Sequence, residues 1–365
     1  SIILFGPRST GKSYYIRNQL KNIFYINLLK SSEYLALSRS PDALDSMVLG
    51  HRDKIIVIDE IQKCPHLLDE VHRLIESQKI QFLMTGSSAR KLKREKDVNL
   101  LAGRAWEAHF FPLTYFEQRE PQLIEILNWG GLPRVLKSKD RKEELKAYVQ
   151  IYLQEEIKNE AIVRKFDQFA RFFETIGFLN GKELEYQSIA SDAAVAPRTI
   201  ANYLEVLRDT LVAFELKPFI YTKSRKAITR SKFYFFDLGV ARFLSKQGEF
   251  EEKSIAFGDA FEHFMITEVR ALLSLFRKDA DLYFWRSKNG QEVDLIVNRE
   301  MAVEFKATEQ VLPKHLKGLV ALKEEQLIKD YYLISLDQNE RTSDGIKIMH
   351  WKTFLKKPNL WQKER

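Results

Sequence analysis

Cysteine is almost absent from this sequence, since Cys64 is the single one among 365 residues. One thiol excludes an intrachain disulfide and leaves no means of building a cysteine-based zinc site. Long hydrophobic runs are also missing: the longest aliphatic run is Ile55 to Ile58, whereas a membrane helix needs about 20 apolar residues. We therefore expect a cytoplasmic protein with no membrane association. Because the chain starts at Ser1 inside an expected strand, we expect the natural protein to extend upstream.

The sequence carries more positive than negative charge, with 58 Lys and Arg against 50 Asp and Glu and a net charge of +8. Hydrophobic residues make up 45% and charged residues 30%, a balance typical of folded globular proteins. A chain of this length predicts two or three domains. Clustered basic residues attract polyanions, so we expect DNA as a partner. The alternative is a charge that serves only solubility.

A glycine-rich loop follows the first expected strand, Ile2 to Phe5, and precedes a helical pattern. Its spacing is G-x-x-x-x-G-K-S, the Walker A pattern, in which backbone amides surround phosphate oxygens at a helix start. We expect Lys12 to reach the β and γ phosphates of ATP and Ser13 to bind Mg²⁺. The candidate nucleotide-binding residues of this loop are Gly6, Pro7, Arg8, Ser9, Thr10, Gly11, Lys12 and Ser13.

A second apolar strand, Ile55 to Ile58, ends in Asp59 and Glu60. An apolar run without alternation is typical of a central parallel strand, and ligands bind at the carboxyl end of such strands. We expect Asp59 to hold Mg²⁺ and Glu60 to orient and deprotonate the attacking water. A further strand candidate, Phe24 to Leu28, lies between the two motifs. The Walker B strand is therefore not the immediate neighbour in sequence of the Walker A strand, which is the additional-strand layout of P-loop ATPases.

These motifs resemble a group of prokaryotic AAA-family ATPases that carry a restriction-endonuclease-like domain at the C-terminus. The resemblance covers essentially the whole chain. Besides the glycine-rich loop, the phrases that carry it are Asp59-Glu60-Ile61-Gln62, Thr85-Gly86-Ser87-Ser88, Leu101-Ala102-Gly103-Arg104, Pro112-Leu113-Thr114 with Glu117, and Gly130-Gly131-Leu132-Pro133. We interpret the last phrase as a structural turn.

The resemblance implies two further residues for the ATPase site. Ser87 follows the expected strand Gln81 to Thr85, at the place where such proteins carry a polar sensor of the γ phosphate, and Thr85 is the alternative. Arg104 precedes an apolar strand over residues 105–110 and resembles an arginine finger, which acts on the ATP of a neighbouring subunit and so predicts a homo-oligomer. The alternative is an arginine that binds carbonyl groups at a helix end.

The middle of the chain has the pattern of a winged helix. A short helix is expected over residues 188–194 and a second one from Arg198, followed by two wing strands over residues 211–216 and 233–236. Six cations lie between the strands with no acid among them: Lys217, Lys223, Arg225, Lys226, Arg230 and Lys232. Such charge suits a DNA backbone, and the alternative is a solvated loop on a docking module. The predicted nucleic-acid contacts are Arg198, Lys223, Arg225, Lys226 and Arg230.

The C-terminal third predicts a helix over residues 259–275 followed by strands over 282–286, 292–297 and 301–307. If the second turn centres on Arg299, Asp294 faces Glu304 with the side chains about 5 Å apart. Two facing carboxylates suit Mg²⁺, with Mn²⁺ as an alternative, and Lys306 on the same face can stabilise charge on a phosphate or position a water.

The order of Asp294, Glu304 and Lys306 resembles the PD-(D/E)xK nuclease motif. The resemblance adds Glu262, on the preceding helix, as a further metal ligand. We therefore expect an α/β chain with an AAA-type ATPase core at residues 1–118, a helical connecting or lid region at 119–165, a winged-helix domain at 166–237 and a nuclease-like domain at 238–365.

The function predicted from these features is a metal-dependent DNA endonuclease that ATP binding and hydrolysis regulate. Its predicted catalytic residues are Glu60, Arg104, Asp294, Glu304 and Lys306. The alternative is a nucleotide-switched DNA-binding or signalling ATPase whose nuclease-like domain serves only for docking, since a fold never guarantees activity.

Overall fold

The computed structural model describes residues 1–88, 103–153 and 166–362 of the 365-residue chain. The chain forms two compact units, one of residues 1–112 with 205–212 and one of residues 113–204 with 213–365. Both contain helices and strands, so the expected mixed α/β class is confirmed. Among the helices of the described ranges, none is long and apolar enough to cross a membrane.

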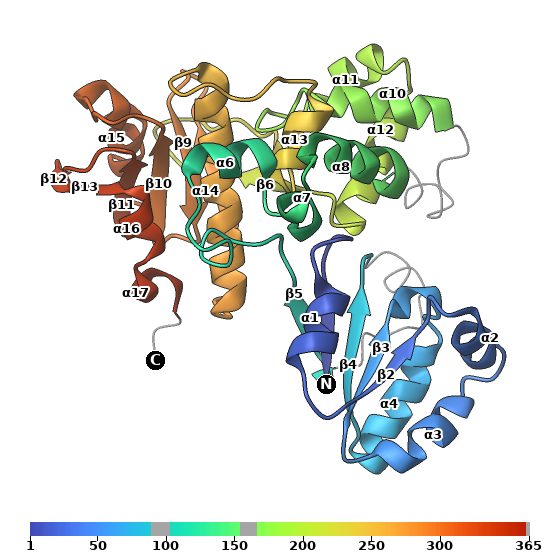
Figure 1. Cartoon of the computed structure of the whole chain (residues 1–365). Coiled ribbons are helices and arrows are strands. Elements are labelled where there is room, and N and C mark those ends of the chain that lie inside the picture. The colour runs from blue at the N-terminus through green and yellow to red at the C-terminus, as the bar shows by residue number, and fades with distance from the viewer. Residues whose placement is uncertain (89–102, 154–165, 363–365) are drawn as a thin grey trace. The chain divides into compact units, whose positions relative to one another are not determined.

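The first unit is a five-stranded parallel sheet with helices between its strands (Figure 1). Its strands are β1 (Ile2–Phe5), β2 (Ile23–Asn27), β3 (Ile55–Asp59), β4 (Gln81–Gly86) and β5 (Trp106–His109). Its helices are α1 (Lys12–Gln19), α2 (Ser31–Arg39), α3 (Ala43–Val48) and α4 (Leu67–Gln78), with 3₁₀ turns η1 (Leu49–His51) and η2 (Ile61–Lys63).

The strand order β2-β3-β4-β1-β5 places β4 between the strands that precede the two ATPase motifs. Phe5 pairs with Gly86, and Ile58 pairs with Met84. This order confirms the expectation that the Walker A and Walker B strands are not neighbours. Because all five strands are parallel, the Gly6–Ser13 loop and Asp59 meet at the same carboxyl edge of the sheet.

The second unit begins with helices and continues into a large sheet. Before the sheet lie α6 (Leu123–Trp129), α7 (Pro133–Lys137), α8 (Arg141–Ala147), a π-helical stretch η4 (Tyr148–Leu153), α10 (Phe166–Gly177), α11 (Tyr186–Asp192) and α12 (Pro197–Asp209). The residues of α12 from Glu205 onward group with the first unit. The helix pair α11 and α12 occupies the positions expected for the two helices of the winged-helix pattern.

Eight strands form the sheet of the second unit, in the order β12-β13-β11-β10-β9-β8-β6-β7. They are β6 (Ala213–Pro218), β7 (Lys232–Phe235), β8 (Leu282–Arg286), β9 (Glu292–Val297), β10 (Met301–Lys306), β11 (Asp330–Ser335), β12 (Arg341–Ser343) and β13 (Ile346–His350). The helices among them are α13 (Leu238–Leu244), α14 (Ile255–Leu275), η5 (Pro313–Leu316), α15 (Lys317–Lys323), α16 (Trp351–Leu355) and α17 (Pro358–Trp361).

The two strands expected to form a wing, β6 and β7, pair antiparallel with each other. However, β6 also pairs in parallel with β8, where Lys217 faces Tyr283. The pair is therefore the edge of the same sheet that carries β9 and β10. The boundary expected between residues 237 and 238 separates no compact units, since residues on both sides of it share one sheet and one unit.

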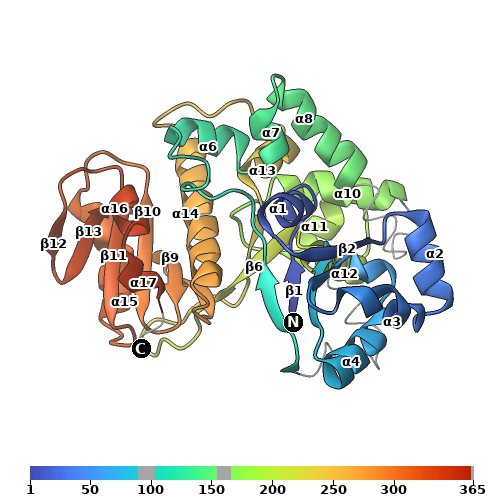
Figure 2. The same cartoon turned by 60° about the horizontal axis from the view of Figure 1, so that its bottom comes forward.

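Two apolar clusters cover this sheet. Val303 of β10 packs in a cluster with residues of α14, such as Phe264 and Val269. The adjacent Ala302 belongs to a second cluster with Leu319 and Leu322 of α15. Since neighbouring strand residues point to opposite faces, α14 and α15 cover opposite sides of the sheet. Figure 2 shows the long helix α14 running beside these strands.

The Gly-Gly-Leu-Pro phrase is a turn held by a buried aspartate, in agreement with its interpretation as structural. Asp237 accepts hydrogen bonds from the amide of Gly131 at 2.7 Å and from that of Val240 at 3.0 Å. Gly130 has a φ of +69°, and a Cβ there would lie 2.3 Å from an Asp237 carboxylate oxygen. Burial raises the pKa of Asp237 to about 6, and the backbone amides partly oppose that rise.

Candidate functional site

The glycine-rich loop lies between β1 and α1, as its sequence predicts. The Lys12 ammonium donates hydrogen bonds to the carbonyls of Gly6 at 2.6 Å and Pro7 at 2.8 Å. Thr10 Oγ1 donates to the carbonyl of Pro7 at 2.9 Å. Ser9 and Gly11 both have positive φ, 61° and 103°, which turns the chain tightly into the helix start. These bonds close the loop around the Lys12 side chain.

Gly6 meets a second constraint besides the one its motif predicts. A Cβ at this position would lie 2.4 Å from the carbonyl oxygen of Phe110, which follows β5. The amide of Gly6 also donates to the carbonyl of Gly86 at 3.1 Å. Glycine is therefore required here by the close packing of backbone from two neighbouring strands.

The carboxylate of Asp59 is the centre of a hydrogen-bond network at the end of β3. Ser13 Oγ donates to Asp59 Oδ2 at 2.9 Å, and the hydroxyls of Tyr25 and Thr85 also donate to this carboxylate. Burial, together with the bond to Asp59, raises the pKa of Tyr25 to about 12. The structure thus brings together the two predicted Mg²⁺ ligands, Ser13 and Asp59, and adds two hydroxyls that fix the carboxylate.

Glu60 follows Asp59 with a φ of +65°, so its side chain leaves the strand in a new direction. Its amide donates to Thr85 Oγ1 at 3.1 Å. The side-chain amide of Gln62 donates to the Glu60 carboxylate and, at 2.9 Å, to Ser87 Oγ. Ser87 Oγ also donates to Glu60 Oε2 at 3.3 Å. The predicted base and the predicted sensor are therefore in direct contact.

Sequence reasoning missed Tyr25 and Gln62 as members of this site, whereas Thr85 was the alternative to Ser87 as the polar sensor. Gln62 stands in the Asp-Glu-Ile-Gln phrase, where a polar residue after the strand end was the available signal. Tyr25 points to the site from the middle of β2, and only the strand order reveals this position. The loop Gly6–Ser13 and the segment Asp59–Gln62 lie together and form one candidate site for a nucleotide with its metal ion.

Arg104 pairs with Glu76 of α4 through its Nε atom. The ion pair lowers the pKa of Glu76. Leu101 and Ala102, which belong to the same phrase, lie outside the described residues. The arginine-finger role of Arg104 stays a prediction that concerns a neighbouring subunit.

A cavity of about 500 Å³ in the second unit contains the predicted nuclease residues. It is open on one side and its lining comes from both halves of the unit. The lining residues are Gly181, Lys182, Glu183, Glu185, Arg230, Lys232, Asp259, Glu262, Arg286, Glu292, Asp294, Glu304 and Lys306. Glu262, Asp294, Glu304 and Lys306, expected together from the sequence, therefore share one cavity.

The register between β9 and β10 agrees with the predicted turn. Val297 pairs with Met301 and Leu295 pairs with Val303. This register is centred on Arg299, and its continuation places Asp294 opposite Glu304. Asp294 Oδ2 accepts a hydrogen bond of 2.8 Å from the amide of Phe305. Both carboxylates are buried, with 3% and 5% of Asp294 and Glu304 exposed.

The electrostatics of this pair show two carboxylates that lack sufficient positive charge. Burial raises the pKa of Glu304 to about 7, against the opposing effect of Lys306. Burial and the nearby Glu304 raise the pKa of Asp294 well above its usual value. Lys306 Nζ lies 2.6 Å from Glu304 Oε1. Within the described residues, Glu304 Oε2 is buried without a hydrogen-bond partner.

Glu262 has a different environment from the other two acids. It accepts hydrogen bonds from Lys232 Nζ at 2.9 Å and from the Tyr234 hydroxyl at 2.6 Å. Lys232 also lies 2.5 Å from Glu292. Lys232, expected among the cations of an exposed wing, is instead buried in this cavity, because β7 joins the edge of the sheet. That expectation is wrong for Lys232.

The oxygen ligands that the cavity offers determine which metal ion it can hold. Asp294 and Glu304 supply adjacent hard oxygen ligands, and the unpaired Glu304 Oε2 needs a cation or donor that the described chain does not provide. No group of three or more His, Cys, Asp or Glu side chains in the described ranges converges to hold a metal. The two-carboxylate set fits a divalent ion, whereas Glu262 is held by Lys232 and Tyr234.

The predicted DNA-binding residues fall into two classes. The guanidinium of Arg225 pairs with Glu324 and Glu325, and Arg230 pairs with Glu185 at 2.7 Å. The side chains of Arg198, Lys223 and Lys226 are exposed. Three backbone amides, those of Lys223, Ser224 and Arg225, bind the Glu325 carboxylate. Part of the expected basic surface is thus neutralised within the chain.

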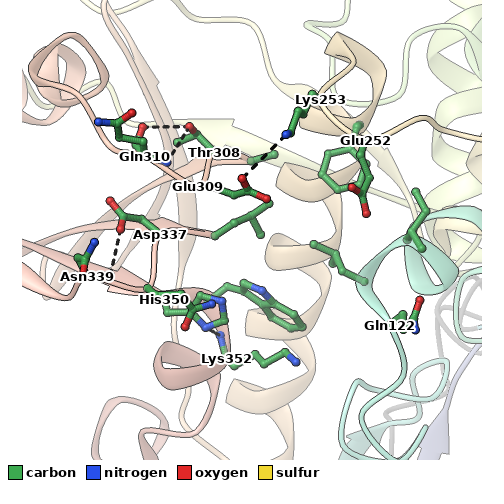
Figure 3. A pocket seen from close by; sticks show the side chains of 17 residues that line it. Gln122, Glu252, Lys253, Thr308, Glu309, Gln310, Asp337, Asn339, His350 and Lys352 are labelled. Carbon is green, nitrogen blue, oxygen red and sulfur yellow. Dashed lines mark hydrogen bonds and ion pairs between the residues drawn. The ribbon is translucent and has the colours of Figure 1, made fainter.

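A second, larger cavity of about 1,210 Å³ lies where β10, β11 and β13 end. Figure 3 shows Lys253 directed toward Glu309 across it, an ion pair of 3.9 Å. Asp337 in its wall is bound by the amides of Val311 and Asn339. None of the residues predicted for ATP, metal or DNA lines this cavity.

The N-terminal part of the chain is similar to a known domain family. Residues 1–118 match an AAA domain. The match supports a P-loop ATPase domain in this part of the chain. Residues 120–251 match a domain of unknown function, DUF8612, and residues 257–354 match another, DUF4143. The cavity at Asp294 and Glu304 is lined by residues of both DUF segments.

Three curated proteins are similar to most of the chain. The uncharacterized protein Rv2008c of Mycobacterium tuberculosis is 24% identical over 317 residues, which cover 84% of this chain and 70% of that protein, and Mb2031c of Mycobacterium bovis matches equally. The uncharacterized protein MJ1637 of Methanocaldococcus jannaschii is 24% identical over 425 aligned residues, covering 97% of this chain and 84% of that protein. The similarity therefore extends beyond the AAA domain.

Proposed function

We propose that this protein is a cytoplasmic ATP-dependent DNA endonuclease whose second unit cleaves phosphodiester bonds with a divalent metal ion. Its AAA domain binds ATP with Mg²⁺ and hydrolyses it, and the nucleotide state governs the second site. The observation that carries the nuclease assignment is the buried pair Asp294 and Glu304, in which one Glu304 oxygen has no hydrogen-bond partner among the described residues and Lys306 lies beside the other.

In the ATPase site, Lys12 neutralises charge on the β and γ phosphates, while the amides of the glycine-rich loop hold the phosphate oxygens. Ser13 and Asp59 would hold the magnesium ion, which screens the phosphate charge. Glu60 accepts the proton of the attacking water. Gln62 and Ser87 hold the Glu60 carboxylate, and we assign Ser87 to sensing the γ phosphate.

In the second site, Asp294 and Glu304 would hold a Mg²⁺ or Mn²⁺ ion, which supplies charge stabilisation and an acidified water. The Phe305 amide fixes the Asp294 carboxylate. Lys306 is 38% exposed at its side chain, so its ammonium can leave Glu304 and stabilise the phosphate as negative charge develops.

The exposed Lys223, Lys226 and Arg198 are the residues that we assign to DNA backbone contact. Arg225 and Arg230 serve mainly to fix the loop, because both are paired with acids. For the ATPase we assign Arg104 to the nucleotide of a neighbouring subunit, which makes the active form a homo-oligomer. This requires Arg104 to exchange Glu76 for phosphate.

The test is incubation of the full-length protein with labelled duplex, branched and single-stranded DNA, with Mg²⁺ or Mn²⁺, and with or without ATP. We expect metal-dependent cleavage of at least one structure and an effect of ATP on its rate. The absence of cleavage under every condition, together with normal ATP hydrolysis, would reject the nuclease assignment.

A second candidate is a nucleotide-switched DNA-binding or signalling ATPase whose second unit serves for docking. The observation that favours it is the pairing of Lys232 and Lys306 with carboxylates inside the cavity, because a purely structural ion network has this form. Metal binding separates the two candidates, since a docking unit has no need of a divalent ion at Asp294 and Glu304.

A further inference from the structure

The cavity that contains Asp294 and Glu304 also contains a lysine, Lys232, that does not belong to the PD-(D/E)xK-like motif. Lys232 lies on β7, the edge strand of the sheet, within the segment that matches DUF8612. The acids that it contacts, Glu262 and Glu292, lie in the segment that matches DUF4143. The two segments therefore complete one site, and Lys232 is the buried one of the three cations, Lys182, Arg230 and Lys232, that the first contributes to its lining.

The geometry of Lys232 is that of a fully paired internal cation. Its ammonium lies 2.9 Å from Glu262 and 2.5 Å from Glu292, and 6% of its side chain is exposed. The Tyr234 hydroxyl, two residues along the strand, donates to the same Glu262 oxygen at 2.6 Å. A buried ammonium is strongly destabilising unless carboxylates compensate it, so Glu262 and Glu292 are committed to Lys232.

The other two acids of the cavity are not compensated in this way. Lys306 lies at ion-pair distance from Glu304 Oε1, and Glu304 Oε2 has no hydrogen-bond partner in the described part of the chain. The cavity therefore contains one carboxylate pair that shares a buried counter-ion, Lys232, and a second pair in which Lys306 contacts one oxygen of Glu304.

The formal charge of the cavity fits one divalent ion. Seven carboxylates and five cations line it, an excess of two negative charges. A single divalent ion at Asp294 and Glu304 would balance this excess, whereas a second one at Glu262 would meet the Lys232 ammonium. Consistent with this, Glu262, Asp294 and Glu304 do not converge as a three-ligand group in the described structure.

We propose that Lys232 takes the place of a metal ion at Glu262 and Glu292, so that this site binds one divalent ion, on Asp294 and Glu304 alone. This inference rests on the proposed metal-dependent function and specifies its metal count. It also replaces the expectation that Glu262 is a metal ligand: Glu262 is the counter-ion of Lys232 and positions it.

The test is Mn²⁺ binding to the nucleotide-free full chain, measured by titration calorimetry. The number of ions lost in the Asp294→Asn/Glu304→Gln double variant defines the stoichiometry of this site. We expect one ion per chain to be lost, and the remaining ones to be unaffected. Glu262→Gln should leave Mn²⁺ affinity within about twofold of the wild type, whereas Glu304→Gln should lower it more than tenfold.

Lys232 is tested by its own matched variants. Lys232→Met should add a second Mn²⁺ per chain, because Glu262 and Glu292 lose their counter-ion, and Lys232→Arg should keep a single one. If Lys232→Met does not fold, the Glu262→Gln measurement in an otherwise unchanged chain still decides the point. A tenfold loss of affinity in Glu262→Gln, or two ions lost in the double variant, overturns the inference.

The outcomes separate this inference from the proposed function. One Mn²⁺ bound through Asp294 and Glu304, with no cleavage of any DNA, supports the inference and rejects the nuclease assignment. No Mn²⁺ dependent on these two carboxylates rejects both. Cleavage together with two ions lost in the double variant supports the nuclease assignment and rejects the role given to Lys232.

Discussion

Asp294 Oδ2 and the amide of Phe305 form a hydrogen bond of 2.8 Å that ties the carboxylate on β9 to the strand that carries Glu304. Because the donor is backbone, the orientation of Asp294 depends on the strand register and not on a mobile side chain. The second carboxylate lies one residue before this amide, so the same register fixes the spacing of both. Substitution of Asp294 or Glu304 therefore tests this arrangement directly.

The ATPase site predicts different effects for two substitutions. Lys12→Ala should weaken ATP binding, because Lys12 contacts phosphate in the ground state, whereas Glu60→Gln should keep binding and lose turnover at least about 100-fold. Fluorescent nucleotide binding and phosphate release measure the two effects. Lys21→Ala, at an exposed position just after α1, is the matched control. Normal turnover of Glu60→Gln would show that another group activates the water.

Gln62 links Glu60 to Ser87, so Gln62→Ala should lower ATP turnover by about 10-fold while ATP affinity changes little. Gln62→Glu places a second carboxylate beside Glu60 and should be more harmful than the alanine. Steady-state ATPase kinetics with separate determination of kcat and KM provide the test. An effect confined to KM would mean that Gln62 acts on binding rather than on the base.

The candidate ATPase site was largely predictable from the sequence, because most of its residues lie in short contiguous motifs. The Gly6–Ser13 and Asp59-Glu60 motifs indicate both the local secondary structure and the ligands that bind there. The β9–β10 hairpin was also predictable, since a turn centred on Arg299 fixes its register. The positions of Tyr25, Lys232 and Tyr234 were not, because they depend on which strands become neighbours, and nothing local in β2 or β7 encodes that order.

A buried acid on α14 makes stability depend on pH. Burial raises the pKa of Glu268 to about 8, and its Oε1 accepts the Tyr115 amide at 3.0 Å. The folded state therefore holds a proton that the unfolded state releases above its ordinary pKa near 4.3. Stability from this group is full below that value and is lost as the pH rises to about 8.

The substitution Glu268→Gln keeps an acceptor for the Tyr115 amide and removes the titration. We expect the variant to gain thermal stability relative to the wild type between pH 5 and pH 9, by an amount on the order of 1 kcal/mol for each unit of pKa difference. Thermal unfolding followed at several pH values measures this. A stability difference that is the same at pH 5 and pH 9 would contradict the buried neutral acid.

DNA contact is predicted to depend on exposed lysines and on salt. Reversing Lys223 and Lys226 to glutamate should weaken binding to all DNA sequences alike and reduce the salt dependence, because phosphate contacts release counterions. Arg225 is left unchanged, since its reversal would oppose Glu324 and Glu325. Fluorescence anisotropy at several salt concentrations is the measurement. An unchanged salt slope would place the DNA surface elsewhere.

The nuclease assignment is tested most directly by the DNA cleavage rate of Asp294→Ala and Glu304→Ala, measured beside ATP hydrolysis in the same preparations. Either substitution should abolish cleavage, Lys306→Ala should lower it by about 100-fold or more, and ATP hydrolysis through Asp59 and Glu60 should stay largely intact. Calcium should bind without supporting efficient cleavage, because its looser coordination positions the water poorly. Cleavage that persists in the Asp294→Ala and Glu304→Ala proteins would contradict the central claim.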